Sequence, residues 1–120
     1  MKLLIIILMM LLTACSEQKR LIDQDVVAAA NIDQLVYAVQ KAKEKKDYRL
    51  LAMKGRRITL PGFERQNVNE ISQRCGIKLM KNTGDVLKND EDRENRRLKY
   101  QFALNFNHII FAICNDKKLQ

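Results

Sequence analysis

The longest periodic stretch of the chain is residues 90–114, which read DEDRENRRLKYQFALNFNHIIFAIC. Its acidic start, Asp90-Glu91-Asp92, places negative charge where a helix has its positive dipole end. Basic residues follow one turn later and can pair with these acids. The apolar residues that come next are spaced so that they fall on one broad side of a helix: Leu98, Phe102, Phe106, Ile109, Ile110 and Ile113. The stretch therefore predicts a long helix.

The same stretch also contains a strand-like pattern. Tyr100, Phe102, Leu104 and Phe106 alternate with other residues at period two, and aromatic side chains favour strands. A β-hairpin turning near Asn107 would fit that alternation. We favour the helix, because the charged lead-in is unsuited to a strand.

Shorter helical segments are predicted upstream. Apolar residues recur at steps of three and four over residues 21–42. Asn31-Ile32-Asp33 can cap a second segment, so one bent helix and two short ones both remain open. Asp47 is then expected to cap a short segment, 48–54, that ends at Gly55.

The middle of the chain contains the turn signals. Residues 57–60 alternate and predict a short extended segment, which needs a partner strand. Pro61-Gly62 predicts a turn that separates two helical halves of the domain. Asn67 or Asn69 is expected to cap a helix that is stopped by Gly76.

The N-terminus has the three parts of an export signal. Lys2 supplies a positive charge, Leu3–Leu12 is apolar, and small Thr13 and Ala14 precede Cys15. The ten apolar residues fall well short of the roughly 20 needed to cross a bilayer as a helix. The segment therefore predicts a cleaved leader, not a permanent membrane span.

The run Leu12-Thr13-Ala14-Cys15 resembles the signal box of bacterial lipoproteins. This resemblance implies cleavage before Cys15, a diacylglycerol on its thiol, and a further acyl chain such as palmitate on its amine. In Gram-negative members Asp after the cysteine usually signals inner-membrane retention, so Ser16 implies the outer membrane. Two or three acyl chains anchor a protein stably.

The chain therefore divides into three parts. Residues 1–14 are expected to be the signal peptide, 15–20 an acylated tether, and 21–120 a single small globular domain. The anchored domain would lie in the bacterial envelope, at the outer membrane facing the periplasm.

With Cys15 assigned to the anchor, two cysteines remain, Cys75 and Cys114. An even count in an oxidising compartment predicts a disulfide. A metal site or a reactive thiol are the alternatives, but two sulfurs and one histidine without Cys-x-x-Cys spacing do not favour zinc.

Residues 78–89 look like a connection. The predicted fold is mainly α: a small disulfide-stapled domain of three to four helices with a short β segment.

The chain is basic, with 22 Lys and Arg against 14 Asp and Glu. Such charge favours nucleic acid as a partner inside a cell, but an exported protein meets anionic lipid, lipopolysaccharide and envelope proteins instead. The basic residues are densest in one segment: Lys41, Lys43, Lys45, Lys46, Arg49, Lys54, Arg56 and Arg57. They form a candidate site for an anionic surface, and the alternative is a solvated helix end.

No catalytic, cofactor or metal site is predicted. Ser72 and His108 could combine a nucleophile with a base, but His108 lies in the most apolar stretch and is interpreted as a packing or surface residue. Asp90-Glu91-Asp92 is explained by the helix start, where adjacent solvated carboxylates have no reason to acquire unusual pKa values.

The sequence therefore predicts a non-enzymatic envelope lipoprotein that acts as an adaptor or assembly factor. Its expected partners are the membrane, through the lipid anchor, and an unidentified envelope protein, with no nucleic acid and no small-molecule substrate. Two alternatives remain: a module that binds anionic lipid or lipopolysaccharide through the basic residues, and a plasmid- or phage-type exclusion lipoprotein.

Overall fold

The computed structural model describes residues 31–84 and 86–118, and residues 35–120 belong to one compact unit. A helix over residues 31–45 comes first. The other elements, in chain order, are β1 (Leu50–Lys54), β2 (Ile58–Thr59), α2 (Val68–Cys75), β3 (Ile77–Leu79) and α3 (Asp90–Lys118). The signal peptide and tether expected at residues 1–20 lie outside the described residues.

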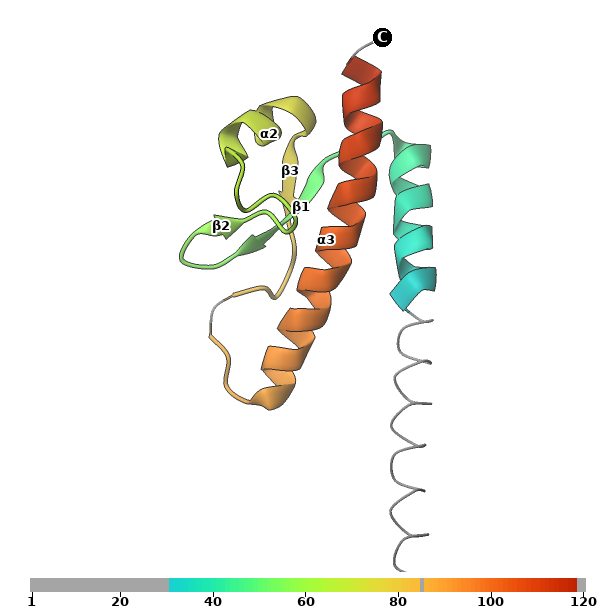
Figure 1. Cartoon of the computed structure of the whole chain (residues 1–120). Coiled ribbons are helices and arrows are strands. Elements are labelled where there is room, and N and C mark those ends of the chain that lie inside the picture. The colour runs from blue at the N-terminus through green and yellow to red at the C-terminus, as the bar shows by residue number, and fades with distance from the viewer. Residues whose placement is uncertain (1–30, 85, 119–120) are drawn as a thin grey trace, which may run out of the picture. The chain divides into compact units, whose positions relative to one another are not determined.

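The three strands form one sheet in the order β2-β1-β3. β2 pairs with β1 antiparallel, with Met53 opposite Thr59. β3 pairs with β1 in parallel, with Leu50 opposite Ile77 and Ala52 opposite Leu79. The crossover from β2 to β3 contains α2 (Figure 1). β1 is therefore the central strand, and β3 lies at one edge.

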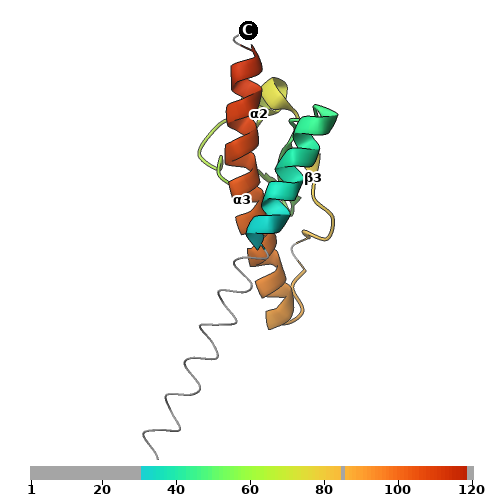
Figure 2. The same cartoon turned by 90° about the vertical axis from the view of Figure 1, so that its right-hand side faces the viewer.

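The core lies where α3 crosses β1 (Figure 1). Residues 35–45 of the first helix run alongside α3 in both views (Figures 1 and 2) and contribute Val39 and Ala42 to the same core. The buried side of α3 repeats at three- and four-residue steps, as a helix requires. Its buried members are Ala103, Phe106, Asn107, Ile110 and Cys114. Ile109, which we predicted on this side, is 40 % exposed.

The long C-terminal helix is confirmed, and the hairpin alternative is wrong. α3 begins at Asp90, as predicted, and the Asn89 side chain accepts a hydrogen bond from the Asp92 N–H at 2.8 Å. Helical hydrogen bonding continues through Asn107, where the hairpin would have turned. The preference for the helix, which rested on the charged lead-in, is therefore correct.

Two further expectations from the middle of the chain are confirmed. α2 is capped by Asn67, whose side chain accepts from the Asn69 N–H, and it ends at Gly76. The extended segment expected at 57–60 is β2, which finds its partner in β1. The mainly helical class with a short β segment is therefore correct.

Two local predictions are wrong. The segment 48–54, expected to follow an Asp47 cap as a helix, contains β1 instead. The connection predicted at 78–89 contains most of β3. Both strands form because pairing and burial with distant segments override weak local preferences. The helix predicted over 21–42 is described only from residue 31 onward, where it is continuous.

Candidate functional site

The basic residues predicted as one anionic-surface site are divided by β1. Lys41, Lys43, Lys45 and Lys46 lie in the last turns of the first helix and at its end, and Arg49 precedes β1. Lys54, Arg56 and Arg57 lie at the opposite end of β1, in and beside the hairpin turn that leads to β2. A strand advances roughly 3.3 Å per residue, so the five residues of β1 separate the groups by more than about 13 Å. The structure therefore contains two smaller basic regions.

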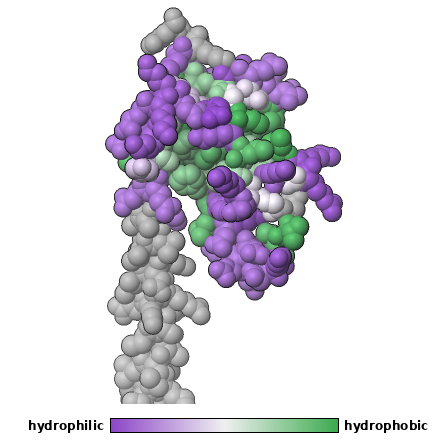
Figure 3. Space-filling model, turned by 180° about the vertical axis from the view of Figure 1, so that it is seen from behind, coloured by the Kyte–Doolittle hydropathy of each residue, from purple (hydrophilic) through white to green (hydrophobic). Residues whose placement is uncertain are grey.

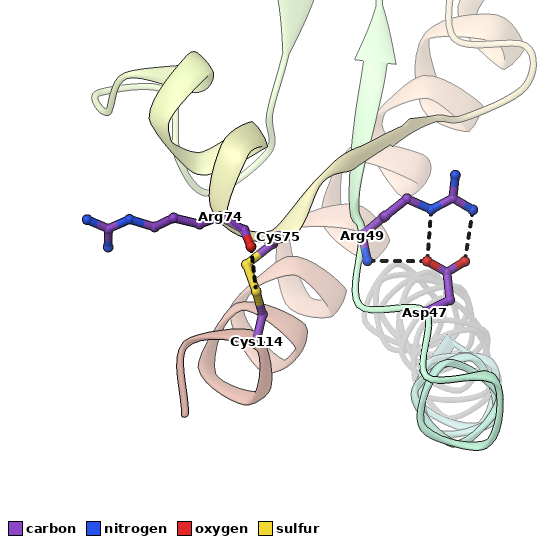
Figure 4. Close-up of a disulfide and its surroundings, with 5 residues drawn as sticks. All are labelled: Asp47, Arg49, Arg74, Cys75 and Cys114. Atoms are coloured by element: carbon purple, nitrogen blue, oxygen red, sulfur yellow. Dashed lines mark hydrogen bonds and ion pairs between the residues drawn. A yellow bond between two sulfur atoms is a disulfide. The ribbon is translucent and has the colours of Figure 1, made fainter. Parts of the chain in front are cut away.

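Arg49 belongs to an ion-pair cluster centred on Asp47 (Figure 4). Its Nε donates to Asp47 Oδ1 at 2.8 Å and its Nη2 donates to Oδ2 at 3.0 Å. Lys78 Nζ lies 3.5 Å from the same carboxylate. The hydrogen bonds from the Arg49 side chain hold the pKa of Asp47 well below its usual range, because they outweigh the opposing effect of burial. Asp47 is thus the acid that joins the start of β1 to β3.

The predicted disulfide between Cys75 and Cys114 is present and joins the end of α2 to α3 (Figure 4). The two Cα atoms are 5.8 Å apart, within the range that disulfides span. Cys114 Sγ also lies 3.5 Å from the Arg74 carbonyl oxygen. A bonded sulfur carries no proton, so this is a packing contact. The bridge fixes the segment from which β3 begins.

His108 packs against the Pro61-Gly62 turn. A Cβ atom at Gly62 would lie 2.7 Å from His108 Nε2, and the His108 ring meets Phe63 edge-on at 5.6 Å between centroids. Ser72 lies in α2, and no hydrogen bond joins Ser72 and His108, both of which are described. The geometry therefore does not assemble the nucleophile and base considered from the sequence.

Glu64 and Tyr100 form a further contact between this turn and α3, which the sequence did not suggest. The Tyr100 hydroxyl donates to Glu64 Oε1, and the Gly62 N–H donates to the same oxygen at 3.3 Å. Burial alone would raise the pKa of Glu64, but these hydrogen bonds leave it below its usual value. The hydrogen bond to Glu64 raises the pKa of Tyr100, with burial acting in the same direction. Both pKa shifts favour the state in which Tyr100 keeps its proton and Glu64 is ionised.

A cavity of about 420 Å³ lies between the loop after β3 and the first turns of α3. Arg96 Nη1 donates to the carbonyl oxygens of Thr83 at 2.6 Å and Gly84 at 2.9 Å. Lys99 Nζ donates to the Asn82 carbonyl at 3.0 Å. These cations therefore hold the loop against α3, and we assign the cavity no ligand.

The outer edge of β3 carries backbone groups that point away from the sheet. The Leu50 N–H donates to the Gly76 carbonyl at 2.9 Å, and the Met80 N–H donates to the Ala52 carbonyl at 2.8 Å. In a parallel pair successive residues point their N–H and C=O groups alternately toward and away from the neighbouring strand. The groups of Ile77 and Leu79 therefore point outward. Within residues 31–84 and 86–118, no hydrogen bond to them is found.

Apolar surface accompanies this open edge. The Leu79 side chain is 50 % exposed, and Ile77 and Met80 are partly exposed. Figure 2 places β3 on the side that faces the viewer in Figure 3, and there hydrophobic residues occupy the middle of the face with hydrophilic residues around them. The signal of this site in the sequence is the alternation of Ile77, Lys78 and Leu79, which is too short to identify a strand.

Between residues 31 and 118, leaving out 85, no cluster of three His, Cys, Asp or Glu side chains could hold a metal ion. In the same part of the chain no helix combines the length and the apolar character needed to cross a membrane.

Comparisons with known proteins identify no relative: no family model, no curated protein and no solved structure matches this chain.

Proposed function

We propose that the protein is a non-enzymatic, lipid-anchored envelope protein whose small domain of three to four helices binds another protein as an adaptor or assembly factor. The observation that carries the binding role is the open edge of β3, where the outward backbone groups of Ile77 and Leu79 lie beside exposed apolar surface. Natural sheets usually cover or block such edges. Although β3 is short and contains Lys78, its free backbone groups can accept a partner chain by strand addition.

The anchoring role is supported by the Leu12-Thr13-Ala14-Cys15 run. An acylated Cys15 would hold the domain at the outer membrane, on the periplasmic side. Anchoring raises the effective concentration of the domain near other membrane proteins, so a modest interface is sufficient.

The hydrogen bonding of the buried polar groups suits a stable binding module. No described side-chain nitrogen or oxygen is both buried and without a hydrogen-bond partner. The buried polar residues Asn107 and Thr83 serve the backbone: Thr83 accepts from the Lys54 N–H at 3.0 Å and donates to the Met80 carbonyl at 3.1 Å. The Thr83 bonds therefore join the end of β1 to the exit of β3.

The test is site-specific photo-cross-linking in cells. A photo-reactive residue replaces Leu79 at the edge or, as a control, the exposed Gln101 on α3, and both are compared with and without Cys15→Ala. We expect one dominant protein adduct from position 79, its loss in the Cys15→Ala background, and none from position 101. Equal labelling from both positions, or no protein adduct from position 79, contradicts the proposal.

A second candidate function, binding of anionic lipid or lipopolysaccharide, is favoured by the hairpin turn. Arg56, Arg57 and Lys54 are exposed there, next to Ile58 at 48 % exposure, so the tip combines basic and apolar side chains as membrane-contacting segments do. Replacing Arg56 and Arg57 with Gln would weaken binding to vesicles containing anionic lipid and leave the cross-link from position 79 unchanged.

A further inference from the structure

We infer that the open edge of β3 receives an extended, acidic segment of the partner protein as a fourth strand of the sheet. This inference rests on the proposed protein-binding function and specifies the chemistry of the partner. It follows from three features of the edge: the direction of its backbone groups, the charge around it and the alternation of its side chains.

The backbone groups define the docking line. The N–H and C=O of Ile77 and of Leu79 point outward, while Gly76 and Met80 bond to β1. A partner strand can therefore pair with residues 77 and 79 without disturbing any existing bond of the sheet. Strand addition at a free edge uses main-chain hydrogen bonds for affinity and side-chain contacts for specificity.

The charge around the edge is positive. The Arg49 side chain lies over the start of β3, since a Cβ atom at Gly76 would be 3.0 Å from Arg49 Cγ. Lys78 lies within β3, and exposed Lys81 follows it. The carboxylate of Asp47 pairs with Arg49 and Lys78 and offsets part of this charge, so the three cations remain in excess over one acid. A segment with negative charge complements this surface, and like charge repels a basic one.

The same charge argues against a second copy as the occupant. Two copies paired edge to edge would place their β3 strands side by side, with Lys78 and Lys81 of both chains in one narrow region. Like charges opposite one another on neighbouring strands are destabilising, and the whole chain has a net charge of +8. The edge is thus protected against self-association while it stays open to an acidic segment.

The side chains of β3 give the partner a pattern. Ile77 and Leu79 lie on one face of the strand and Lys78 on the other, because successive side chains point to opposite faces. Neighbouring strands bring side chains of the same face together. The matching segment therefore alternates apolar residues, beside Ile77 and Leu79, with acidic residues on the face of Lys78, whose ammonium already lies near Asp47 and the Phe106 ring.

The test measures hydrogen–deuterium exchange by mass spectrometry on the acylated protein in detergent. Two synthetic peptides are compared: one of alternating Glu and Val, and its matched control of alternating Lys and Val. We expect the Glu peptide to slow exchange in fragments covering residues 76–81 by about tenfold at saturation, and the Lys peptide to leave exchange unchanged. Equal protection by both peptides, or by neither, overturns the inference.

Variants separate the backbone from the side-chain contribution. Leu79→Pro removes the outward N–H and leaves the bonds to β1 in place, so the Glu peptide should bind at least about tenfold more weakly, whereas Leu79→Ala keeps that N–H and should retain most of the binding. Unchanged exchange in α3 shows that each variant is folded. Lys81→Glu should weaken binding, and Lys88→Glu, a change of an exposed lysine beyond the edge, should not.

Two other outcomes of these experiments separate the acidic strand from self-association and from the adaptor function. Protection of residues 76–81 that grows with protein concentration, without peptide, identifies a second copy as the occupant and overturns the inference. A protein cross-link from position 79 together with failure of the Glu peptide leaves the adaptor function standing and rejects the acidic strand.

Discussion

The side-chain amide of Asn107 pairs with both backbone groups of Leu51. Asn107 Oδ1 accepts from the Leu51 N–H at 2.7 Å, and Asn107 Nδ2 donates to the Leu51 carbonyl at 2.9 Å. The same Nδ2 donates to the Pro61 carbonyl at 3.0 Å. Asn107 is completely buried. The Asn107 side chain therefore continues the hydrogen bonding of β1 beyond the two residues of β2. It also joins the Pro61 turn to β1 and to α3.

Replacing Asn107 with Ala should destabilise the domain strongly. The change leaves the Leu51 N–H and the Leu51 and Pro61 carbonyls without this partner, and each buried unpaired group costs about 1–3 kcal/mol. We expect the free energy of unfolding, measured in urea, to fall by about 3 kcal/mol or more. Asn105→Ala, a change of an exposed asparagine on the same helix, should cost much less. Equal losses in the two variants would show that Asn107 is not a specific support.

Removing the Cys75–Cys114 disulfide should also lower stability. The bridge closes a loop of 39 residues, for which the loss of chain entropy in the unfolded state predicts about 4 kcal/mol. A reductant should therefore lower the melting temperature of the native chain. It should have no effect on a variant in which Cys75 and Cys114 are both Ala, and that variant should melt near the reduced native chain. A melting temperature that does not respond to reductant would contradict this expectation.

Elements whose signals are local could be predicted from the sequence. α3 has a charged first turn and helical spacing over many residues, and α2 has an asparagine cap and a terminal glycine. The disulfide followed from the number of cysteines left after Cys15. Each of these signals lies in residues close together in the chain or in a residue count, so it can be recognised without tertiary structure.

Elements whose signals are distant could not be predicted. β1 pairs with residues 77–79, more than twenty positions later, and nothing near Asp47 indicates that partner. The basic residues at 41–57 are neighbours in sequence, yet a strand in their midst separates them. Asn107 looked like a turn within an apolar stretch. Its helical spacing with Ala103 and Ile110 was the available signal, because a polar residue on a buried helix face must have a hydrogen-bond partner.

Asp47 should make stability dependent on acid. Its pKa is held below the usual range in the folded protein, mainly by the Arg49 side chain, so its contribution is complete above the ordinary carboxyl pKa of about 4 and is lost as the pH falls below that value. Asp47→Asn should lower the free energy of unfolding at pH 7 and reduce its decrease between pH 5 and pH 3.

The control for Asp47 is Glu44→Gln, which removes the exposed Lys41 pair at 3.0 Å. Exposed pairs contribute little, so this variant should change stability only slightly at either pH. Urea unfolding at pH 7, 5 and 3 measures all three proteins. An Asp47→Asn curve parallel to that of the native chain over this range would show that Asp47 is not the group responsible.

A side chain at Gly62 should be costly. Its φ of +89° lies in the region that L-residues rarely adopt, and a Cβ atom would stand 2.7 Å from His108 Nε2. Gly62→Ala should therefore destabilise the domain by about 1–2 kcal/mol from backbone strain, with the steric conflict in addition. Gly84→Ala is the matched control, because nothing lies within 4 Å of a Cβ atom there, and it should be close to neutral. His108→Ala combined with Gly62→Ala should recover the steric part of the loss but not the backbone part. Additive effects of the two changes would show that the His108 ring does not rest on Gly62.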